Sequence, residues 1–454
     1  MKKRWIILMG IMALISVLGV LMPEQSDLWV MDEGVDMANV AWMITATIFV
    51  LMMTPGLSFF YGGMVGQKNV ISTVLQSIIA MGVISVIWVF FGFSLAFGDS
   101  IGSFVGDPRT FFMFKGVGAQ VNEMLAPTIP LALYALFQMK FAIITPSLIT
   151  GSFAERVRFS GYLVFMILFC IFVYCPLAHW TWHPDGFLRQ MGVIDFAGGI
   201  VVHASSGVAA LAGAIFLGRR KDANKPHTPA NIVLVILGAS LLWLGWFGFN
   251  AGSSLAADSV AIKAFLNTNT ASATAMLVWI FFDCLRGRKP SAMGAAIGAV
   301  VGMVAITPSA GYVSVGESVF IAFLTTIVCN TAVHWKNKTR VDDALDVFPT
   351  HGVGGIFGTI MTGVFVDGLL DGDVKMFFIH VLAVVLVCVY TFVVTYALYW
   401  ITNKMIPMRV SEKSERLGLD LSQHDEQYGG FVATASEGHE LAEYSDEDQA
   451  EGIN

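Results

Sequence analysis

Val374-Lys-Met-Phe-Phe-Ile-His-Val-Leu-Ala-Val-Val-Leu-Val-Cys-Val-Tyr-Thr-Phe-Val-Val-Thr-Tyr-Ala-Leu-Tyr-Trp-Ile-Thr402 is an apolar run whose one Lys, Asp, Glu or Arg side chain is Lys375. About 20 apolar residues are enough for a helix to cross a bilayer. Comparable runs recur along most of the chain, which is 56% hydrophobic and 13% charged. Ordinary soluble domains are about 25% charged. The composition therefore predicts a polytopic, all-α membrane protein.

Eleven membrane-spanning helices are expected from these runs, and turn or charge signals such as Asp107-Pro108 separate them. The expected spans are 37–62, 70–97, 126–150, 160–178, 197–218, 230–250, 259–284, 291–306, 312–334, 350–366 and 374–402.

The distribution of basic residues predicts the orientation of the spans. With eleven spans that start outside, 17 of the 26 Lys and Arg fall in segments expected to be cytoplasmic, and 5 fall in external segments. Basic residues concentrate on the cytoplasmic side of membrane proteins. We therefore expect a multi-pass protein of the cell inner membrane, with the mature N-terminus outside and the C-terminus in the cytoplasm.

Three regions are expected along the chain. Residues 1–24 carry Lys2-Lys-Arg4 and then an apolar stretch to Met22, as in a secretory signal. No A-x-A site follows, so the segment is either a cleaved signal peptide or a retained extra helix. Residues 25–402 form the membrane domain. Residues 403–454 form a cytoplasmic tail that is expected to be partly disordered, because from Leu417 onward it has ten acidic and no basic residues.

Two histidines lie in expected spans, where an ionisable side chain is costly and often functional. His203 follows Gly198-Gly-Ile-Val-Val, and His351 precedes Gly-Val-Gly-Gly. On a regular helix each shares a face with small residues, the side that packs against protein rather than lipid. A lone histidine there is more often a hydrogen-bonded core residue, whereas two on comparable faces favour a functional pair.

Spans one to five and six to ten suggest two inverted five-helix repeats followed by a final long helix. An odd number of spans gives the second repeat the opposite orientation, and transporters place their sites between such repeats. The support in the sequence is weak, because the Asp that precedes each histidine, Asp195 or Asp346, stands at a different separation.

A polar and aromatic face lies at the end of the sixth span. Trp246, Phe249, Asn250 and Ser253 follow one another at i, i+3, i+4 and i+7. Such aromatics are typical of the membrane interface. They also suit a cation that loses water, through cation–π attraction and a hydroxyl acceptor. Spacing alone does not separate the two interpretations.

Several motifs, in consistent order from residue 55 to residue 420, resemble those of the ammonium transporter (Amt/Mep/Rh) family. The most specific are Asp195-Phe-Ala-Gly-Gly-Ile-Val-Val-His203 and Gly245-Trp-Phe-Gly-Phe-Asn-Ala-Gly-Ser253. The others are Phe60-Tyr-Gly-Gly63, Ala154-Glu-Arg-Val-Arg158, Ile306-Thr-Pro308, Arg340-Val-Asp-Asp343 and Gly418-Leu-Asp420.

The resemblance implies a homotrimeric, Amt-type ammonium transporter with one narrow path per subunit. It assigns ammonium or methylammonium to an external site of Trp182, Ser253 and Phe141, a gate to Phe141 and Phe249, and pore imidazoles to His203 and His351. It also gives Asp195 a supporting electrostatic role and places Phe137, Gln138, Tyr174, Trp246 and Thr307 around the vestibule.

The resemblance further implies that NH3 passes the two histidines after NH4+ loses its proton, with separate transfer of H+. A PII-type signalling protein is the implied partner at the cytoplasmic face. No cofactor and no metal are expected, since the five cysteines form no ligand cluster. A basic nucleic-acid-binding surface is not supported either.

One residue departs from what a cation site requires. Lys140 directly precedes Phe141. Since adjacent residues lie about 100° apart on a helix, Lys140 either points away and snorkels outward or lines the vestibule and repels NH4+. The rival classes are an ion-coupled transporter for another solute, an ammonium receptor and an intramembrane enzyme. The spans offer no acidic pair for the first and no partnered nucleophile for the last, and the tail offers the receptor no output domain.

Overall fold

Helices make up most of the computed structural model, which describes residues 2–22, 26–223 and 227–429. The long elements are α1 (Lys2–Leu21), α2 (Met37–Met64), α3 (Val70–Ile87), α5 (Leu131–Ile149), α6 (Phe159–Phe169), α9 (Ser205–Leu217), α10 (Ile232–Ala251), α11 (Ser259–Leu285), α12 (Ala292–Ile306), α13 (Val315–Lys336), α14 (Val353–Phe365) and α15 (Val374–Met405).

Shorter elements extend or connect these helices. They are α4 (Phe93–Phe97), α7 (Cys175–Trp182), α8 (Phe187–Gln190), α16 (Glu412–Leu417), α17 (Leu419–His424), and the antiparallel strands β1 (Ser100–Ile101) and β2 (Val105–Gly106). Single 3₁₀ turns are η1 (Ser26–Trp29), η2 (Gln67–Asn69), η4 (Phe112–Phe114), η5 (Thr150–Ser152), η8 (Gly252–Ser254) and η10 (Leu369–Asp371).

The expected membrane class is confirmed. Within the described ranges, nine helical stretches are long and apolar enough to cross a bilayer. Each of the eleven expected ranges contains a helix, but α11 and α12 are not among the nine. α12 has only 15 residues, and α11 carries polar side chains such as Asn267 and Asp283. The count of eleven spanning helices therefore stays a prediction.

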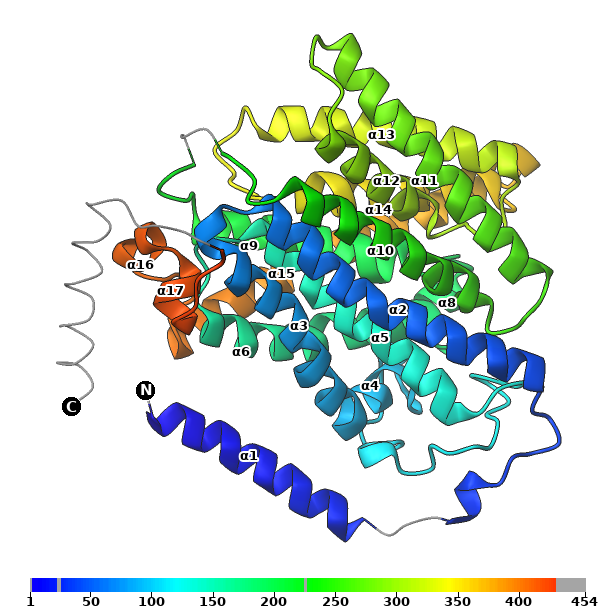
Figure 1. The fold of residues 1–454 in the computed structure, drawn as a ribbon. Coiled ribbons are helices and arrows are strands. Elements are labelled where there is room, and N and C mark those ends of the chain that lie inside the picture. Colours follow the sequence, from blue (N-terminus) through cyan, green and yellow to red (C-terminus); the bar gives the residue numbers. More distant parts are fainter. Residues whose placement is uncertain (1, 23–25, 224–226, 430–454) are drawn as a thin grey trace.

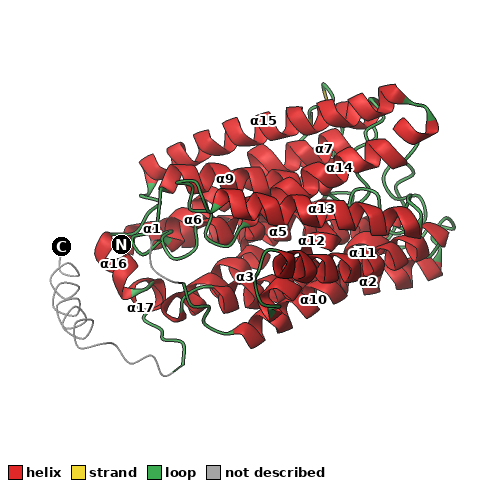
Figure 2. Cartoon of the chain, turned by 90° about the horizontal axis from the view of Figure 1, so that it is seen from above, coloured by secondary structure: helices red, strands yellow, loops and turns green. Residues whose placement is uncertain are grey.

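The helices from α2 to α15 form one elongated bundle (Figures 1 and 2). α16 and α17 cover one end of it, which we call the tail face, and the start of α2 lies at the opposite face. Close packing depends on small residues. A Cβ on Gly238 of α10 would overlap the Phe60 backbone nitrogen of α2, so only glycine lets the two helices approach this closely.

α1 lies beside the bundle with its apolar side chains exposed (Figure 1); Val20, for example, is 85% exposed. A helix is expected here both for the apolar region of a signal peptide and for an extra membrane helix. Cleavage or retention of residues 1–24 therefore stays a prediction, and residues 1 and 23–25 lie outside the described part.

Four π-helical turns interrupt or begin the membrane helices: η3 (Trp88–Gly92), η6 (Cys170–Tyr174), η7 (Gly199–Ala204) and η9 (Phe348–Gly352). The expectation of regular α geometry around His203 and His351 is therefore wrong, because both residues lie in such a turn. π turns widen a helix locally and are frequent at functional sites.

Candidate functional site

Two phenylalanine rings from different helices stack on each other beside the histidines. Phe141 of α5 and Phe249 of α10 stack with centroids 4.2 Å apart and planes 25° apart. Both side chains are buried, at 1% and 0% exposure. The structure thus brings together the two rings expected to form a gate, although they belong to distant parts of the sequence.

Trp182, the last residue of α7, packs against one of these rings. Its ring meets Phe141 edge-on at 5.8 Å, and its Nε1 donates a hydrogen bond of 2.9 Å to the Asp195 carbonyl oxygen. Ser253 is half-buried at the end of α10, and its hydroxyl donates to the Phe249 carbonyl at 2.8 Å. These contacts fix the indole and leave the Ser253 oxygen with a free lone pair to accept another donor.

Asp195 anchors the start of η7, the turn that carries His203. Its two carboxylate oxygens accept four backbone N–H groups, from residues 198 to 201, at 2.6–3.2 Å. Negative charge at a helix N-terminus is stabilising. Asp195 thus contacts both the Trp182 indole and the first turn of the histidine helix, and its electrostatic role toward a cation stays a prediction.

His203 and His351 face each other behind the gate. Their Nδ1 atoms lie 3.3 Å apart, and their rings are 25° from parallel. They are 1% and 2% exposed. His203 also stacks on Trp246 at 5.2 Å. Since one Nδ1 must donate and the other accept, one ring is protonated at Nε2 and the other presents Nε2 as an acceptor.

The histidines line a small cavity of about 10 Å³, roughly the space for one water-sized molecule. All its other lining residues are apolar: Met53, Leu57, Phe60, Ile144, Leu148, Val202, Leu242, Trp246, Phe249 and Val300. His203 Nε2 is buried without a hydrogen-bond partner in the described structure. The cavity therefore offers a small molecule two imidazoles and little other polarity.

The five supporting residues divide into two groups. Phe137 packs on Phe141 at 5.0 Å, and Trp246 Nε1 donates to the Thr307 hydroxyl at 2.9 Å, so these three contact the gate or the histidine stack. Gln138 and Tyr174 are buried as well, but the Tyr174 ring packs on Trp88 rather than on the gate rings.

The acid that matches Asp195 is Asp343, and the sequence-based pairing with Asp346 is wrong. Asp343 Oδ2 accepts the Phe348 N–H at 2.7 Å, at the start of the π turn that carries His351. Asp346 instead pairs with Lys336 at 2.6 Å. Asp195 and Asp343 each precede their histidine by eight residues. This equal spacing was the signal in the sequence that could have identified Asp343.

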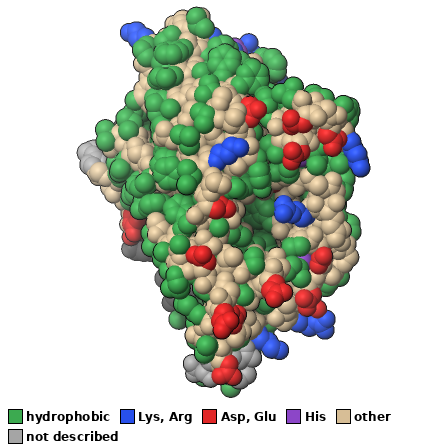
Figure 3. All heavy atoms as spheres, turned by 90° about the vertical axis from the view of Figure 1, so that its right-hand side faces the viewer, with side chains coloured by type: hydrophobic (Ala, Val, Ile, Leu, Met, Phe, Trp, Pro, Cys, Tyr) green, Lys and Arg blue, Asp and Glu red, His purple; other side chains and the backbone are tan. Residues whose placement is uncertain are grey.

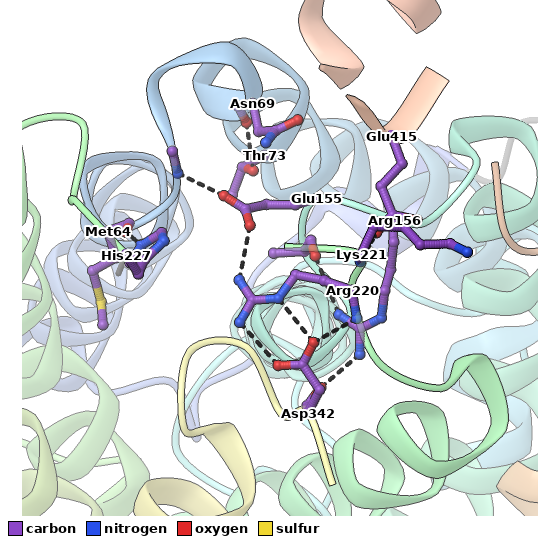
Figure 4. A network of polar contacts seen from close by, with 12 residues as sticks. Met64, Asn69, Thr73, Glu155, Arg156, Arg220, Lys221, His227, Asp342 and Glu415 are labelled. Carbon is purple, nitrogen blue, oxygen red and sulfur yellow. Dashed lines mark hydrogen bonds and ion pairs between the residues drawn. The ribbon is translucent and has the colours of Figure 1, made fainter. Parts of the chain in front are cut away.

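A second buried polar cluster lies at the tail face (Figure 4). Arg220 bridges Glu155 at 2.8 Å and Asp342 at 2.9 Å. Burial opposes ionisation of Asp342, but hydrogen bonds from Arg220 and the charge of Arg156 lower its pKa to about 2. Arg409 forms an ion pair with Glu415 of the tail at 2.8 Å, and the Lys221 backbone N–H donates to the same carboxylate at 2.6 Å. The cluster thus ties three loops and the tail together.

Lys140 does not snorkel to the surface. It is 8% exposed, and its Nζ lies 3.7 Å from the Met139 sulfur. No carboxylate pairs with it in the described part of the chain. The outward placement is therefore wrong.

The opposite face carries acidic side chains among apolar ones (Figure 3). Exposed acids of its connecting segments include Asp32, Glu33, Asp36, Asp258, Asp367 and Asp371. A surface of this sign attracts cations over several ångströms at low ionic strength.

A bundle of apolar, membrane-length helices with a small histidine-lined cavity beside a stacked aromatic pair is typical of a membrane transporter or channel. The family model described as Ammonium Transporter Family matches residues 41–428, and the chain belongs to this family. This family consists of transporters, so the expectation that the chain is not an enzyme is confirmed.

Relatives and solved structures agree. The ammonium transporter of Bacillus subtilis is 44% identical over 402 residues, 86% of this chain and 98% of that protein. The ammonium transporter Amt1 of Archaeoglobus fulgidus is 39% identical over 396 residues, 86% and 98% of the two chains. The crystal structure of Saccharomyces cerevisiae Mep2 superposes with a TM-score of 0.81 at 32% identity, covering 88% of this chain and 94% of that one.

Proposed function

We propose that this protein transports ammonium across the cytoplasmic membrane by recruiting NH4+ and conducting NH3. Trp182, Phe141 and Ser253 bind the cation at the opposite face, through the aromatic faces and the hydroxyl oxygen. The observation that carries the proposal is the pair of imidazoles, 3.3 Å apart at Nδ1, in an otherwise apolar cavity behind stacked rings.

Charge makes deprotonation necessary on this path. An ion that enters an apolar cavity loses its hydration at large cost, whereas neutral NH3 enters far more cheaply. This requirement also lets the protein select NH4+ over K+, an ion of similar size, because K+ has no proton to lose. In the cavity, one Nε2 donates to NH3 and the other accepts from it. The shared Nδ1 contact offers a route for H+, so we infer separate transfer of H+ and NH3 and net charge movement.

We also propose the architecture implied by the resemblance: eleven spans in residues 25–402, two inverted five-helix repeats and α15 as the last helix. The equal eight-residue spacing of Asp195–His203 and Asp343–His351 supports the repeat. The excess of basic residues at the tail face supports a cytoplasmic tail in residues 403–454 and an inner-membrane location. Residues 430–454 lie outside the described part.

Assembly and regulation belong to the same proposal. Exposed apolar side chains on α11 and α13, such as Phe281 and Phe323, are suited to lipid or to neighbouring subunits of a homotrimer. A PII-type protein docking at the tail face would cover the mouth nearest His351.

Proteoliposomes with the purified protein test the mechanism. Uptake of labelled methylammonium should be inhibited by ammonium but not by amino acids, and ammonium pulses should give a current. Ser253→Ala should raise KM, and His203→Ala should abolish or alter the current. Ser240→Ala, on the exposed side of α10, is the control. Uptake without current would reject separate H+ transfer, and absence of saturable uptake would reject the function.

A further inference from the structure

His380 is a fully buried histidine outside the path described above. It lies on α15, where nine of the 32 residues are buried, and its own exposure is 0%. Its Nε2 lies 3.1 Å from the Ile194 backbone nitrogen, and its Nδ1 lies 3.0 Å from the Met376 carbonyl oxygen. No step of the proposed transport cycle uses this imidazole.

The two partners define its protonation. The Ile194 N–H can only donate, so Nε2 must be an unprotonated acceptor. The Met376 carbonyl can only accept, so Nδ1 must carry the hydrogen. His380 is therefore a neutral ring with its proton on Nδ1, and a ring protonated on both nitrogens would lose the bond to Ile194.

This bond holds the segment from which the recruiting site is built. Ile194 directly precedes Asp195, whose carbonyl accepts the Trp182 indole and whose carboxylate holds the first turn of the His203 helix. On the other side, the Phe196 N–H donates to the Pro308 carbonyl at 3.0 Å. The segment is thus held between α15 and the end of α12, with Asp195 at its centre.

The packing leaves His380 little freedom to move. A Cβ on Gly363 of α14 would lie 2.9 Å from the His380 Cβ. α14 therefore presses its backbone against the ring, and the ring is held against residue 194. In the described structure, we find no other acceptor for the Ile194 N–H.

We propose that His380 is a positioning residue for the ammonium-recruiting site: its Nε2 fixes Ile194, and through Asp195 it sets the place of the Trp182 indole. The inference rests on the proposed function. A buried N–H without an acceptor is costly, so without this nitrogen the segment rearranges to find another partner. Trp182 then moves relative to Phe141, and binding of the cation weakens more than its passage through the cavity.

A matched pair of amides tests the role of the acceptor. In His380→Gln the amide oxygen can reach the place of Nε2, whereas in His380→Asn it reaches only the place of Nδ1. We expect His380→Asn to raise KM for methylammonium about tenfold, equivalent to ~1.4 kcal/mol, with Vmax nearly unchanged. We expect His380→Gln to stay close to wild type. Val387→Ala, which truncates another fully buried side chain of α15, is the packing control.

The outcomes separate the inference from the function. Wild-type protein without saturable uptake would reject the proposed function. Saturable wild-type uptake with an unchanged KM in His380→Asn would overturn the inference, as would equal KM increases in the Gln and Asn variants or in Val387→Ala. If His380→Asn fails to reach the membrane, nitrogen NMR of histidine-labelled wild type decides. The wild-type signal that is missing from the His380→Gln spectrum belongs to His380. Its chemical shift should show a proton on Nδ1, and a proton on Nε2 would overturn the inference.

Discussion

The side chains of this site differ in how well their roles can be predicted from the sequence. His203 and His351 are evident, because ionisable residues interrupt long apolar runs. The pairing of Phe141 with Phe249 came only from the family resemblance, since nothing in their spacing brings two distant aromatic residues together. The acceptor role of His380 was out of reach, because it depends on a backbone N–H of another segment.

Lys140→Met should stabilise the protein. A buried amine without a carboxylate partner has lost its hydration without full compensation, and an apolar side chain of similar length fills the same space. We expect a gain of about 1 kcal/mol or more, seen as a higher Tm in detergent. We expect KM for methylammonium to stay the same.

Leu136→Met, at an exposed position of the same helix, is the control for Lys140→Met. A lower Tm in Lys140→Met would show that the amine has a stabilising partner. A lower KM would place the amine in the vestibule, where it repels the cation.

At the scale of the helix, the sequence predicts that each helix exists and roughly where it begins and ends, but it does not predict the backbone geometry inside the helix. All eleven expected ranges are helical, because apolar run length is a strong signal. The π turns of η7 and η9 were missed, since one extra residue per turn leaves no mark in composition. Each of these two turns begins beside a buried carboxylate that accepts backbone N–H groups.

Asp343→Asn should change the pH dependence of stability. Burial raises the pKa of Asp343 from 3.8 to about 6, with Asp346 adding to the rise and Lys336 opposing it. The folded state therefore binds this proton more tightly than the unfolded state. The stability from this group is present below about pH 4 and is lost as pH rises to about 6, a loss of roughly 3 kcal/mol.

Thermal unfolding in detergent between pH 4 and pH 8 measures this effect. The Tm of Asp343→Asn minus that of wild type should increase from pH 4 to pH 6 and then level off. The exposed Asp371→Asn should show no such increase. A constant difference across the range for Asp343→Asn would contradict the assignment.

At the scale of the whole molecule, the tail is joined to the bundle by polar contacts as well as by buried apolar side chains such as Met408 and Leu419. Asp420 accepts the N–H groups of Ile71 at 3.0 Å and Ser72 at 2.7 Å, and so caps α3. Leu419 N–H donates to Asn69 Oδ1 at 2.8 Å. The acidic composition of the tail gave no indication of this docking, because composition does not show which carboxylate meets a helix end.

Asp420→Ala should release the described part of the tail. The loss of the two cap acceptors costs about 1 kcal/mol. Limited trypsin digestion, at Lys413 and Arg416 of α16, should then proceed faster than in wild type. Glu426→Ala, at an exposed position beyond α17, is the control. Equal digestion rates for Asp420→Ala and wild type would show that other contacts hold the tail.

On the proposed path, the small cavity beside the two imidazoles limits how many molecules can pass at once. The cavity has space for one small molecule, so each molecule would have to leave before the next one enters. The rate of transport would then saturate when the cavity is always occupied, and a molecule that leaves slowly would slow the passage of the next one. Two permeants supplied together at saturating concentrations would compete for this one cavity, so their combined rate would not exceed that of the faster one alone.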